Sequence, residues 1–411
     1  MKKCCIIGLG YIGLPTAAIV AEAGIKVVGI DVKKHIIDTI NKGNIHIKEP
    51  NLETYVKKAV NSGFLKAQLN IIEADIFVIT VPTPFKKNKS KIPEPDIKFV
   101  EMAALEISKV VKENDLILIE STSPVGTTKK IAKIILDKTD LSPKQVQFAY
   151  CPERVLPGNI LEELRSNDRV LGGLTIEASK KAELFYSKFC KGKLIQTNSD
   201  NAELVKLAEN SFRDINIAFA NELSIICEKL DINVYELISI ANHHPRVNIL
   251  KPGCGVGGHC IAVDPWFIAS QFPNDTKLIQ SARDVNLKKN LWVVKKIMDY
   301  RKNFMKKQNK EPVIGCLGLS FKPNIDDLRE SPALKIYNNL LAQGLDIIAC
   351  EPNLVNHNSI KLYELNDVIK KADIVIILVG HLEFKNINLL GKEFYDFSGE
   401  NNFSKTNSII N

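Results

Sequence analysis

A cysteine and a carboxylate stand close together in a stretch that is unusually rich in glycine. Cys260 follows Gly255-Val256-Gly257-Gly258-His259, and Asp264 lies four positions after the thiol. A cysteine thiolate attacks carbonyl carbon well, and a glycine-rich backbone can approach a ligand closely or hold an oxyanion with its amides. Taken alone, the pattern also fits a tight loop around a small buried cysteine. Only the rest of the chain can distinguish a nucleophile from a structural thiol.

A long helix is predicted from Ala202 to about Leu230, because no Pro or Gly interrupts this segment. Its polar residues Lys206, Asn210 and Arg213 recur at helical spacing, so Lys206 and Asn210 could converge on one ligand atom. Spacing alone favours the simpler interpretation, which is an ordinary solvent-exposed face. An apolar stripe on the same helix predicts a spine between two domains and contains Leu204, Ala208, Ile215, Phe219, Leu223 and Ile226.

The N-terminus carries the pattern of a dinucleotide-binding turn. A predicted strand from Lys3 to Leu9 leads into Gly8-Leu9-Gly10-Tyr11-Ile12-Gly13, and a predicted helix runs from Pro15 to Ala23. In this pattern the first glycine makes the tight turn, the second lets the backbone reach a pyrophosphate, and the third lets the helix pack on the strand. The N-terminus of the helix then faces the phosphates.

The second predicted strand, Lys26 to Ile30, ends in Asp31. An acidic residue at this distance from the glycines accepts a hydrogen bond from the ribose 2′-hydroxyl of a dinucleotide. A carboxylate there also repels a 2′-phosphate. The sequence therefore predicts NAD rather than NADP.

Polar side chains follow three more predicted strands. The strands are Ile76 to Val81, Leu116 to Glu120 and Val146 to Tyr150. The carboxyl ends of parallel strands carry ligand-contacting loops. The hydroxyls of Thr83, Ser121 and Thr122 could therefore line the nicotinamide side, and Glu153 could act as a base toward water. Each of the four could instead be an ordinary turn or cap residue.

A second α/β unit is predicted in the C-terminal part of the chain. It follows a helical stretch ending near Arg301 and a lysine-rich linker, and its strands are Val313 to Leu317, Asp346 to Cys350 and Ile374 to Val379. Its first turn, Gly315-Cys316-Leu317-Gly318, lacks the full dinucleotide pattern, so we expect a nucleotide other than NAD. Further on, Lys322 and Arg329 could contact phosphates from two sides. The alternative is an ion-paired surface loop with Asp326, Asp327 and Glu330.

Composition and charge argue against several classes of function. The nine cysteines have no repeated spacing, so neither a disulfide framework nor a zinc site is predicted, and a cytoplasmic location follows. Neither a signal peptide nor a membrane span is predicted. The net charge of +8 suits an anionic small substrate, whereas the run from Lys86 to Lys91 lacks the interleaved aromatic residues that would favour nucleic acid. Adjacent side chains of His243 and His244 diverge, so no metal is predicted there, while Arg246 stays a candidate for ligand binding.

These motifs, in their order along the chain, resemble the UDP-glucose/GDP-mannose dehydrogenase family. The segments that carry the resemblance are Gly8 to Gly13, Val81 to Pro84, Glu120 to Thr127, Cys151 to Gly158, Lys206 to Asn221, His244 to Leu250, Gly255 to Trp266 and Phe321 to Pro332. The resemblance implies an α/β fold with two Rossmann-like domains joined by a long central helix. It implies an NAD-binding domain over residues 1–198, a central helical dimerisation domain over 199–301 and a UDP-binding domain over 302–411. We also expect a homodimer through the central helix, with Arg246 reaching the neighbouring site.

The resemblance further implies roles for individual residues. The expected catalytic residues are Cys260, Lys206, Asn210, Asp264, Glu153 and Thr122. Contacts with NAD are expected from Gly8, Gly10, Tyr11, Ile12, Gly13, Asp31, Thr83, Ser121, Thr122 and Arg329. Contacts with a UDP-sugar substrate are expected from Glu153, Arg154, Val155, Lys206, Asn210, Arg213, Arg246, Asn248, Gly257, Phe321 and Lys322.

The reaction implied by the resemblance is a four-electron oxidation of a sugar C6 hydroxymethyl group to a carboxylate, with two NAD used in turn. Cys260 would hold the aldehyde as a thiohemiacetal and then as a thioester, which water hydrolyses with help from Glu153. UDP-N-acetyl-D-mannosamine is the substrate that the resemblance favours. Cys151-Pro152-Glu153-Arg154 marks the N-acetyl subgroup of the family, in place of the Asn-Pro-Glu start that is usual in UDP-glucose enzymes. UDP-N-acetylglucosamine is the alternative, and UDP-glucose is less favoured.

Two other classes of function stay open. A two-electron β-hydroxyacid dehydrogenase of similar architecture would need no nucleophilic thiol, so Cys260 argues against it. A non-catalytic nucleotide-sugar sensor would have no use for Cys260, Lys206, Asn210 and Asp264 together. Cys254, where relatives are expected to have proline, adds the hypothesis of an oxidative pairing with Cys260.

Overall fold

The computed structural model describes residues 3–86, 92–258, 260–354, 359–385, 387–389 and 391–398. The chain forms two compact units. The first contains the chain up to Glu209 together with Trp266–Phe272, and the second contains Asn210–Pro265 and the chain from Pro273 onward. Within the described ranges, no helix combines the length and the apolar character needed to cross a membrane. Most of the lysine run predicted as a surface loop, residues 87–91, lies outside these ranges.

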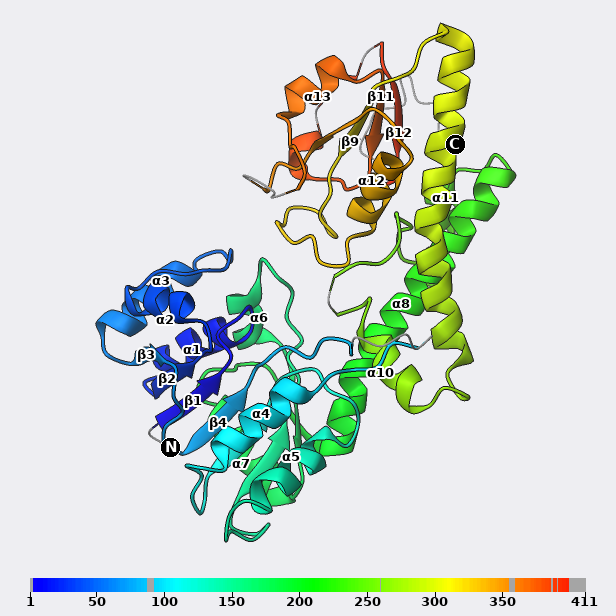
Figure 1. Cartoon of the computed structure of the whole chain (residues 1–411). Coiled ribbons are helices and arrows are strands. Elements are labelled where there is room, and N and C mark those ends of the chain that lie inside the picture. The colour runs from blue at the N-terminus through cyan, green and yellow to red at the C-terminus, as the bar shows by residue number, and fades with distance from the viewer. Residues whose placement is uncertain are drawn as a thin grey trace. The chain divides into compact units, whose positions relative to one another are not determined.

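The first unit is built on an eight-stranded sheet (Figure 1) with the strand order β3-β2-β1-β4-β5-β6-β7-β8. All neighbouring strands are parallel except β6 and β7, which are antiparallel. The strands are β1 Lys3–Ile7, β2 Lys26–Ile30, β3 Leu65–Gln68, β4 Ile76–Ile79, β5 Leu116–Ile119, β6 Gln147–Tyr150, β7 Arg169–Gly173 and β8 Leu194–Asn198.

Helices cover both faces of this sheet, as expected for strands that are apolar on both sides. In β1, Cys4 and Ile6 belong to one buried cluster, while Cys5 and Ile7 belong to the other. The first cluster is completed by α1 Gly13–Glu22, α2 Lys34–Asn41, α3 Leu52–Asn61, α6 Ile160–Ser166 and α7 Ile176–Tyr186. The second cluster is completed by α4 Lys98–Ile107 and α5 Thr127–Leu136.

Most strands of the first unit agree with the sequence patterns. The bounds of β2 are the predicted ones, and the ends of β1, β4, β5 and β6 lie within two residues of prediction. The sequence does not predict β3, β7 or β8. Strands β3 and β8 carry polar residues and lack a continuous apolar run, which explains why their patterns are weak.

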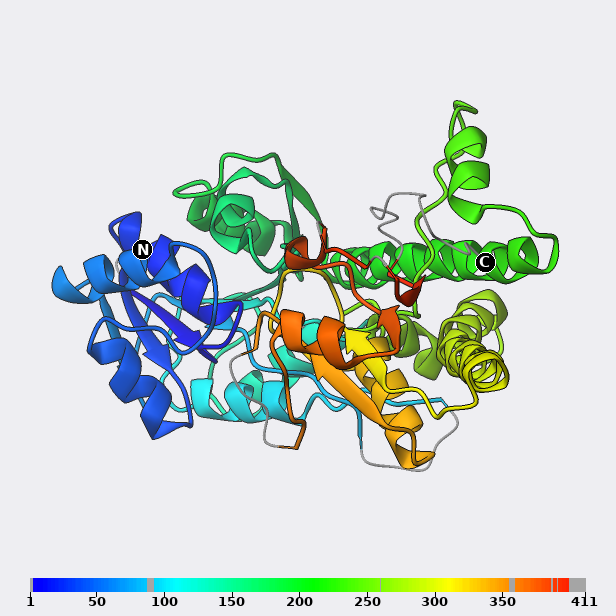
Figure 2. The same ribbon diagram turned by 90° about the horizontal axis from the view of Figure 1, so that it is seen from above.

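The predicted long helix is α8, Ser199–Lys229, which continues from the first unit into the second. Beyond Asn210 it lies against α11, Lys277–Gln308 (Figure 1, Figure 2). Two shorter helices stand between them in sequence, α9 Val234–Ala241 and α10 Asp264–Gln271.

The burial of α8 corrects two expectations from spacing. Lys206 and Asn210 are not on a solvent-exposed face, since each is only 8% exposed. Conversely, four residues of the apolar stripe are exposed: Ala208, Leu204 to 42%, Phe219 to 49% and Ile226 to 50%. Spacing defines a face of a helix but not what packs against it. In this helix the covered face is largely polar.

Helix α11 corrects a further expectation, because it is longer than predicted. The segment from Lys302 to Lys310 is predicted as a linker, yet the helix continues to Gln308. Lysine is a good helix former, and Phe304 continues the buried stripe one turn after Tyr300.

The C-terminal part of the second unit is a four-stranded parallel sheet with the order β10-β9-β11-β12 (Figure 1). Its elements are β9 Ile314–Leu317, α12 Pro332–Ala342, β10 Ile347–Cys350, α13 Leu365–Lys371, β11 Ile374–Ile377, the 3-10 turn Leu382–Phe384 and β12 Glu393–Asp396. Helices α11 and α12 pack on one face, and α13 packs on the other. The ends of β9, β10 and β11 lie within two residues of prediction, whereas β12 is half-buried throughout and has no predictive pattern.

Candidate active site

The glycines after β1 meet steric demands of the turn. Gly8 has a φ of +94°, and a Cβ there would lie 2.8 Å from the carbonyl oxygen of Thr80. A Cβ on Gly13 would lie 1.8 Å from the carbonyl oxygen of Gly8, so α1 packs directly on the turn. A Cβ on Gly10 would meet no described atom within 4 Å, so this backbone is accessible to a ligand.

Asp31 supports the same turn from the end of β2. Its Oδ2 accepts a hydrogen bond from the Leu9 amide at 3.1 Å, and its Oδ1 accepts one from the Lys33 amide at 2.9 Å. A carboxylate has further lone pairs for a ribose hydroxyl. The N-cap of α1 is Ile12, next to the half-buried Tyr11, and it offers no capping side chain, so the first-turn amides suit phosphate. The turn therefore fits NAD.

Three predicted hydroxyl residues lie together where β4 and β5 end. The Thr83 hydroxyl donates to the carbonyl of Thr122 at 2.7 Å. The buried Ser121 hydroxyl donates to the carbonyl of Val81 at 2.7 Å. These bonds tie the loop after β4 to the loop after β5, as expected for loops at one edge of a parallel sheet.

Glu203 attaches the loop after β5 to α8. Its buried carboxylate accepts hydrogen bonds from the amides of Gly126 at 2.6 Å and Thr128 at 2.7 Å, and from the Thr128 hydroxyl at 2.6 Å. Burial raises the pKa of Glu203, and these hydrogen bonds oppose the rise. The carboxylate thus occupies the positive N-terminus of α5. Lys206 follows one turn later on α8 and is held in place by the same attachment.

Glu153, the predicted base, is buried beside an arginine. Its Oε2 accepts a hydrogen bond from Arg169 Nη2 at 2.8 Å, and its Oε1 accepts one from the Arg154 amide at 2.7 Å. The Arg154 side chain pairs with Glu209 of α8 at 3.4 Å. Val155 packs against the buried cluster on the first face of the sheet.

The predicted nucleophile lies in a turn that leads into α10. The carbonyl of Cys260 accepts hydrogen bonds from the amides of Val263 at 3.0 Å and Asp264 at 2.8 Å. The buried Asp264 accepts a hydrogen bond from Asn210 Nδ2 at 2.5 Å. The structure thus brings Cys260, Asp264 and Asn210 together from a loop and a helix that are far apart in sequence.

The glycines before Cys260 allow its loop to pack on the loop after β9. A Cβ on Gly257 would lie 2.7 Å from the Phe321 Cβ, and a Cβ on Gly258 would lie 2.8 Å from the Phe321 ring. The Gly258 amide also donates to the carbonyl of Arg329 at 3.1 Å. No side chain larger than glycine fits at these two positions. The loop that leads to Cys260 (the nucleophile loop) is therefore in direct contact with the loop after β9 (the predicted phosphate loop, residues 319–331).

A buried polar network supports the nucleophile loop from the other side. The Gly253 amide donates to Asn221 Oδ1 at 3.0 Å, and Asn221 Nδ2 donates to Asn286 Oδ1 at 2.9 Å. Asn286 Nδ2 donates to Asp214 Oδ1 at 2.8 Å, and Arg283 donates to the same oxygen at 2.6 Å. Helices α8 and α11 thereby fix where the loop begins.

Cys254 lies in the same loop but in a different environment. Its sulfur faces the carbonyls of Leu378 and Phe397, at 3.5 and 3.6 Å. Burial raises the pKa of the Cys254 thiol to about 12. Thiol–disulfide exchange needs a thiolate, so this environment argues against the oxidative pairing with Cys260. All nine cysteines are thiols.

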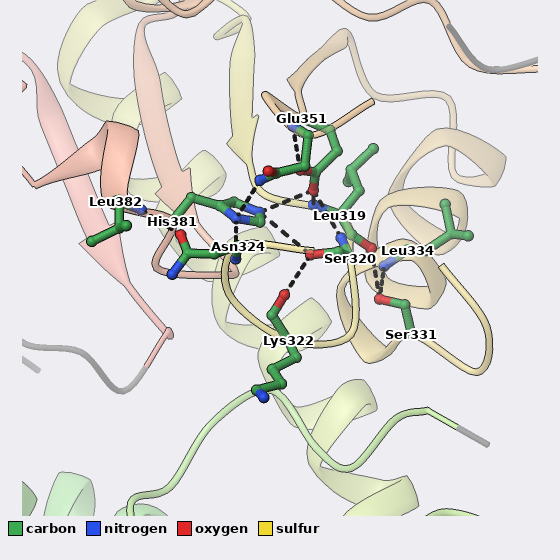
Figure 3. Close-up of polar contacts among 10 residues, drawn as sticks. Leu319, Ser320, Lys322, Asn324, Ser331, Leu334, Glu351, His381 and Leu382 are labelled. Carbon is green, nitrogen blue, oxygen red and sulfur yellow. Dashed lines mark hydrogen bonds and ion pairs between the residues drawn. The ribbon is translucent and has the colours of Figure 1, made fainter. Parts of the chain in front are cut away.

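The predicted phosphate loop, residues 319–331, is held by a buried carboxylate and an imidazole (Figure 3). Glu351 Oε2 accepts hydrogen bonds from the amides of Leu319 at 2.7 Å and Ser320 at 2.9 Å, and it lies 3.1 Å from His381 Nε2. His381 Nδ1 accepts from the Asn324 amide at 2.9 Å. Burial by itself would raise the pKa of Glu351, but these partners hold it below its ordinary value. Glu351 follows β10 as Asp31 follows β2, and each carboxylate accepts a hydrogen bond from an amide in the loop after the neighbouring strand.

The two cations predicted to meet phosphates differ in their surroundings. Arg329 is exposed and ion-paired with Asp327 at 2.6 Å, as in the alternative of an ion-paired surface loop. Lys322 is half-buried, and its carbonyl accepts from the Ser320 hydroxyl at 2.8 Å (Figure 3). The backbone of Lys322 is therefore fixed by the Glu351–His381 pair.

Three predicted substrate contacts lie on the surface of the second unit. Arg213, Arg246 and Asn248 are all exposed. The turn that carries Arg246 and Asn248 is closed by Asn242, whose side chain bonds both the amide and the carbonyl of Ile249. The structure does not bring these three residues to the Cys260–Asp264 turn by any contact that it records among the described residues.

Sequence reasoning misses three kinds of supporting residue. Arg169 lies on β7, which no pattern predicts, and its pairing with Glu153 depends on the antiparallel register of that strand. Glu203 has no signal beyond a charge on a predicted helix. His381 also gives no signal, but an acidic residue at the end of a strand, such as Glu351, could have suggested a second turn-supporting carboxylate. Within the described ranges, no group of three or more His, Cys, Asp or Glu side chains could hold a metal ion.

Three family models match the chain. They are the NAD binding domain, the central domain and the UDP binding domain of the UDP-glucose/GDP-mannose dehydrogenase family, over residues 2–190, 200–288 and 315–400. The chain is 53% identical over 399 residues to UDP-N-acetyl-D-mannosamine dehydrogenase from Campylobacter jejuni, covering 93% of this chain and 96% of that protein. It is 47% identical over 396 residues to NDP-N-acetyl-D-galactosaminuronic acid dehydrogenase from Ralstonia nicotianae, covering 93% and 92%.

A solved structure supports the same grouping. UDP-D-ManNAc dehydrogenase from Pyrococcus horikoshii matches this chain with a TM-score of 0.88 and 34% identity, covering 97% of this chain and 99% of that one. The expected fold class is thereby confirmed, as is NAD as the cofactor of the first domain. The motifs, the fold and these similarities agree, and the chain belongs to the UDP-glucose/GDP-mannose dehydrogenase family.

Proposed function

We propose that this protein oxidises UDP-N-acetyl-D-mannosamine at C6 to UDP-N-acetyl-D-mannosaminuronate. The observation that carries the proposal is the turn in which Cys260 leads to Asp264, with Asn210 bonded to Asp264 at 2.5 Å. A nucleophile, a buried carboxylate and an amide donor are the groups that covalent aldehyde oxidation requires. The substrate is suggested by the relative from Campylobacter jejuni, whose name specifies UDP-N-acetyl-D-mannosamine.

NAD would be held by the turn after β1, with Asp31 at the adenosine ribose and Thr83, Ser121 and Thr122 toward the nicotinamide. When bound, NAD accepts a hydride from C6 of the sugar, once for each of two molecules used in turn. The carboxylate of Asp31 favours a free 2′-hydroxyl over a 2′-phosphate. We therefore expect higher kcat/KM with NAD than with NADP, and equal values would contradict this role of Asp31.

The first oxidation needs a group that receives the proton of the C6 hydroxyl. Asp264, together with Lys206 and a water, would take this proton, and Asn210 keeps the Asp264 carboxylate oriented through the 2.5 Å hydrogen bond. Lys206 and Asn210 lie one turn apart on α8 and would steady the oxyanion that forms at C6. Losing one such donor typically lowers the rate by about 10²–10³-fold.

Cys260 would keep the aldehyde bound. Its sulfur would add to the aldehyde carbon while the thiol proton passes to the aldehyde oxygen, which gives a thiohemiacetal. Loss of the C6 hydride to the second NAD and loss of the hydroxyl proton would then give a thioester. Water then attacks the thioester carbon, the C–S bond breaks, and the thiol is regenerated with the carboxylate product. Glu153 would accept the proton of the attacking water. Arg154, Val155, Gly257, Phe321 and Lys322 are the proposed substrate contacts around these steps, and Arg329 is proposed to reach NAD.

The identity of the sugar is the most specific part of the proposal. The relative from Ralstonia nicotianae is named for an N-acetylgalactosaminuronic acid, so the corresponding N-acetylgalactosamine nucleotide is a second candidate substrate. UDP-N-acetylglucosamine also stays in consideration, since it differs from the favoured substrate by one epimeric hydroxyl.

A stoichiometric assay tests both the reaction and the sugar. Purified protein is given NAD and, separately, UDP-linked N-acetylmannosamine, N-acetylglucosamine, N-acetylgalactosamine and glucose, and NADH is counted per sugar consumed. We expect two NADH per N-acetylmannosamine nucleotide and the highest kcat/KM with that sugar. One NADH per sugar would overturn the four-electron course, and a preference for another sugar would overturn the substrate.

We also propose a homodimer through α8. Phe212, Phe219 and Ile226 are exposed and recur every seven residues along this helix. They form an exposed stripe, which shares Phe219 and Ile226 with the apolar stripe predicted from the sequence but is a different set of residues. Pairing of two such stripes would cover them and would let Arg246 reach the neighbouring site. The three-domain division at residues 1–198, 199–301 and 302–411 and a cytoplasmic location complete the proposal.

A further inference from the structure

A cluster of buried charged and polar groups lies behind Glu153 in the first unit. We propose that Arg169 is a positioning residue for Glu153, and that Glu120 and Tyr186 hold Arg169 in turn. The inference rests on the proposed role of Glu153 in thioester hydrolysis. It assigns to the edge formed by β5, β6 and β7 the task of orienting the base.

The geometry of the cluster links its members in a chain. Arg169 Nη2 donates to Glu153 Oε2 at 2.8 Å, and Arg169 Nη1 lies 3.6 Å from Glu120 Oε1. The Tyr186 hydroxyl donates to Glu120 Oε1 at 2.6 Å. The guanidinium carbon of Arg169 lies 4.6 Å from the centre of the Tyr186 ring. All four side chains are buried, so water screens these interactions little.

The strand register explains why the arginine faces the base. Strands β6 and β7 are antiparallel, with Ala149 opposite Gly173 and Tyr150 opposite Gly172. Continuing this register places Glu153 opposite Arg169. The parallel register of β5 and β6, with Ile119 opposite Tyr150, places Glu120 next to the same point. A parallel β7 would have put the arginine at the far edge of the sheet.

The charges within the cluster favour a fixed assignment of protons. One guanidinium cannot balance two buried carboxylates, so one carboxyl group is best kept protonated. Burial, followed by the charge of Glu153, raises the pKa of Glu120 to about 7, although Arg169 opposes the rise. Glu120 is thus the group that holds the proton below neutral pH, and the charge of Arg169 is directed to Glu153.

This arrangement leaves Glu153 ready to accept a proton from water. Its two oxygens are each held by one donor, Arg169 on Oε2 and the Arg154 amide on Oε1. A carboxylate oxygen has a second acceptor site, so each can still receive a hydrogen bond from the attacking water. Misplacing a catalytic group by about 1 Å costs on the order of 10²-fold in rate.

A purely structural role for Arg169 makes a different prediction. If the cluster only holds the three strand ends together, a change at Arg169 should slow every step alike or only lower stability. A positioning role should slow the hydrolysis step selectively, because Glu153 is proposed to act only there.

Arg165 offers a matched control within the same unit. It also pairs with a glutamate, Glu22, and its guanidinium lies 4.8 Å from the ring centre of Tyr55. Arg165 is on α6 and makes no recorded contact with Glu153. Arg165→Lys therefore reports what loss of an arginine of this kind costs the fold, without touching the base.

The test mixes each full-length variant rapidly with NAD and UDP-N-acetyl-D-mannosamine and follows NADH. Acid-quenched samples are weighed by intact-protein mass spectrometry for sugar bound to Cys260. For Arg169→Lys we expect a normal NADH burst, a kcat about 10²-fold lower and accumulated thioester. For Arg165→Lys we expect normal values. For Arg169→Met we expect the same defect, because Glu153 loses the donor that holds its Oε2.

The outcomes distinguish the proposed role of Glu153 in hydrolysis from the proposed positioning role of Arg169. Glu153→Gln should accumulate the thioester, and normal hydrolysis by this variant would overturn the proposed function of Glu153. If Glu153→Gln accumulates thioester while Arg169→Lys turns over like Arg165→Lys, the positioning role of Arg169 is wrong. Equal slowing of burst and hydrolysis by Arg169→Lys would also overturn it. If Arg169→Met does not fold, Arg169→Lys alone decides between these results.

Discussion

At the scale of single residues, the two cysteines of the nucleophile loop show how surroundings divide chemistry. Cys260 lies in the turn before Asp264, whereas the Cys254 sulfur faces two backbone carbonyls in the core of the second unit. The pKa of Cys254 is raised to about 12 by burial, so its thiol is a poor nucleophile. Identical side chains six positions apart are thus suited to different tasks.

This contrast gives a matched pair of variants. Cys260→Ser should still bind NAD, measured by calorimetry, but should form no uronic acid, because a serine hydroxyl does not add to the aldehyde as a thiolate does. Cys254→Ala removes a thiol from the same loop and should retain both binding and acid formation. Normal steady-state acid production by Cys260→Ser, measured by mass spectrometry, would refute the covalent route.

Glu120 carries a prediction about stability and pH. Its pKa is raised by burial from 4.5 to about 7, so between these values the folded state binds a proton that the unfolded state has released. This contribution to stability is complete below pH 4.5 and is lost as pH rises through about 7. The shift corresponds to a loss on the order of 3 kcal/mol.

Glu120→Gln keeps the shape of the protonated acid and an acceptor for Tyr186, but it cannot ionise. We expect urea unfolding to show this variant gaining stability relative to the unsubstituted protein as pH rises from 5 to 8. A difference between the two proteins that stays constant over this range would contradict the raised pKa of Glu120.

At the scale of elements, the loop after β9 depends on a carboxylate that no ligand needs to touch. Glu351 and His381 fix the backbone on which Lys322 stands (Figure 3). Because the pKa of Glu351 is held below its ordinary value of 4.5, its contribution to stability is present above that value and is lost as pH falls through the lowered pKa.

Glu351→Gln tests this support. At pH 7 we expect a loss of about 1–3 kcal/mol in the free energy of unfolding, because a charged acceptor of several buried donors is removed. We also expect a higher KM for the UDP-sugar and little change in NAD affinity. The difference in stability should narrow at pH values below 4.5. An unchanged KM with lowered stability would mean that the pair supports only the fold.

The same elements show what a sequence can and cannot predict. Strands β1, β2, β4, β5 and β6 and the NAD turn follow from local patterns, since each strand–turn–helix unit carries its own apolar run and glycines. The position of Arg169 opposite Glu153 does not follow, because it depends on the direction in which β7 joins the sheet. The burial of Lys206 and Asn210 also depends on packing, and spacing alone favours the wrong face.

Helix α11 gives a second example of the same limit. The lysines after Arg301 suggest a linker, but they are compatible with a helix whose buried side continues through Phe304. The composition of a segment indicates how exposed it is on average. It does not indicate whether one buried apolar residue per turn, such as Phe304, is enough to keep the segment helical.

At the scale of the whole molecule, the exposed stripe on α8 predicts assembly. Phe219 lies at its centre and is 49% exposed in a single chain. An apolar stripe of Phe212, Phe219 and Ile226 along one long helix suits pairing with the same stripe of a second copy. The exposure of Arg246 agrees with a role toward a neighbouring subunit.

Phe219→Asp should therefore separate the proposed dimer, because two carboxylates would be buried face to face near its symmetry axis. We expect sedimentation velocity at micromolar concentration to show a monomer, with activity reduced if Arg246 serves a neighbouring site as proposed. Phe99→Asp is the matched control, since Phe99 on α4 is 44% exposed and lies outside the stripe. It should stay dimeric and active. A Phe219→Asp variant that stays dimeric would exclude this stripe as the interface, and one that is monomeric but fully active would exclude the shared site.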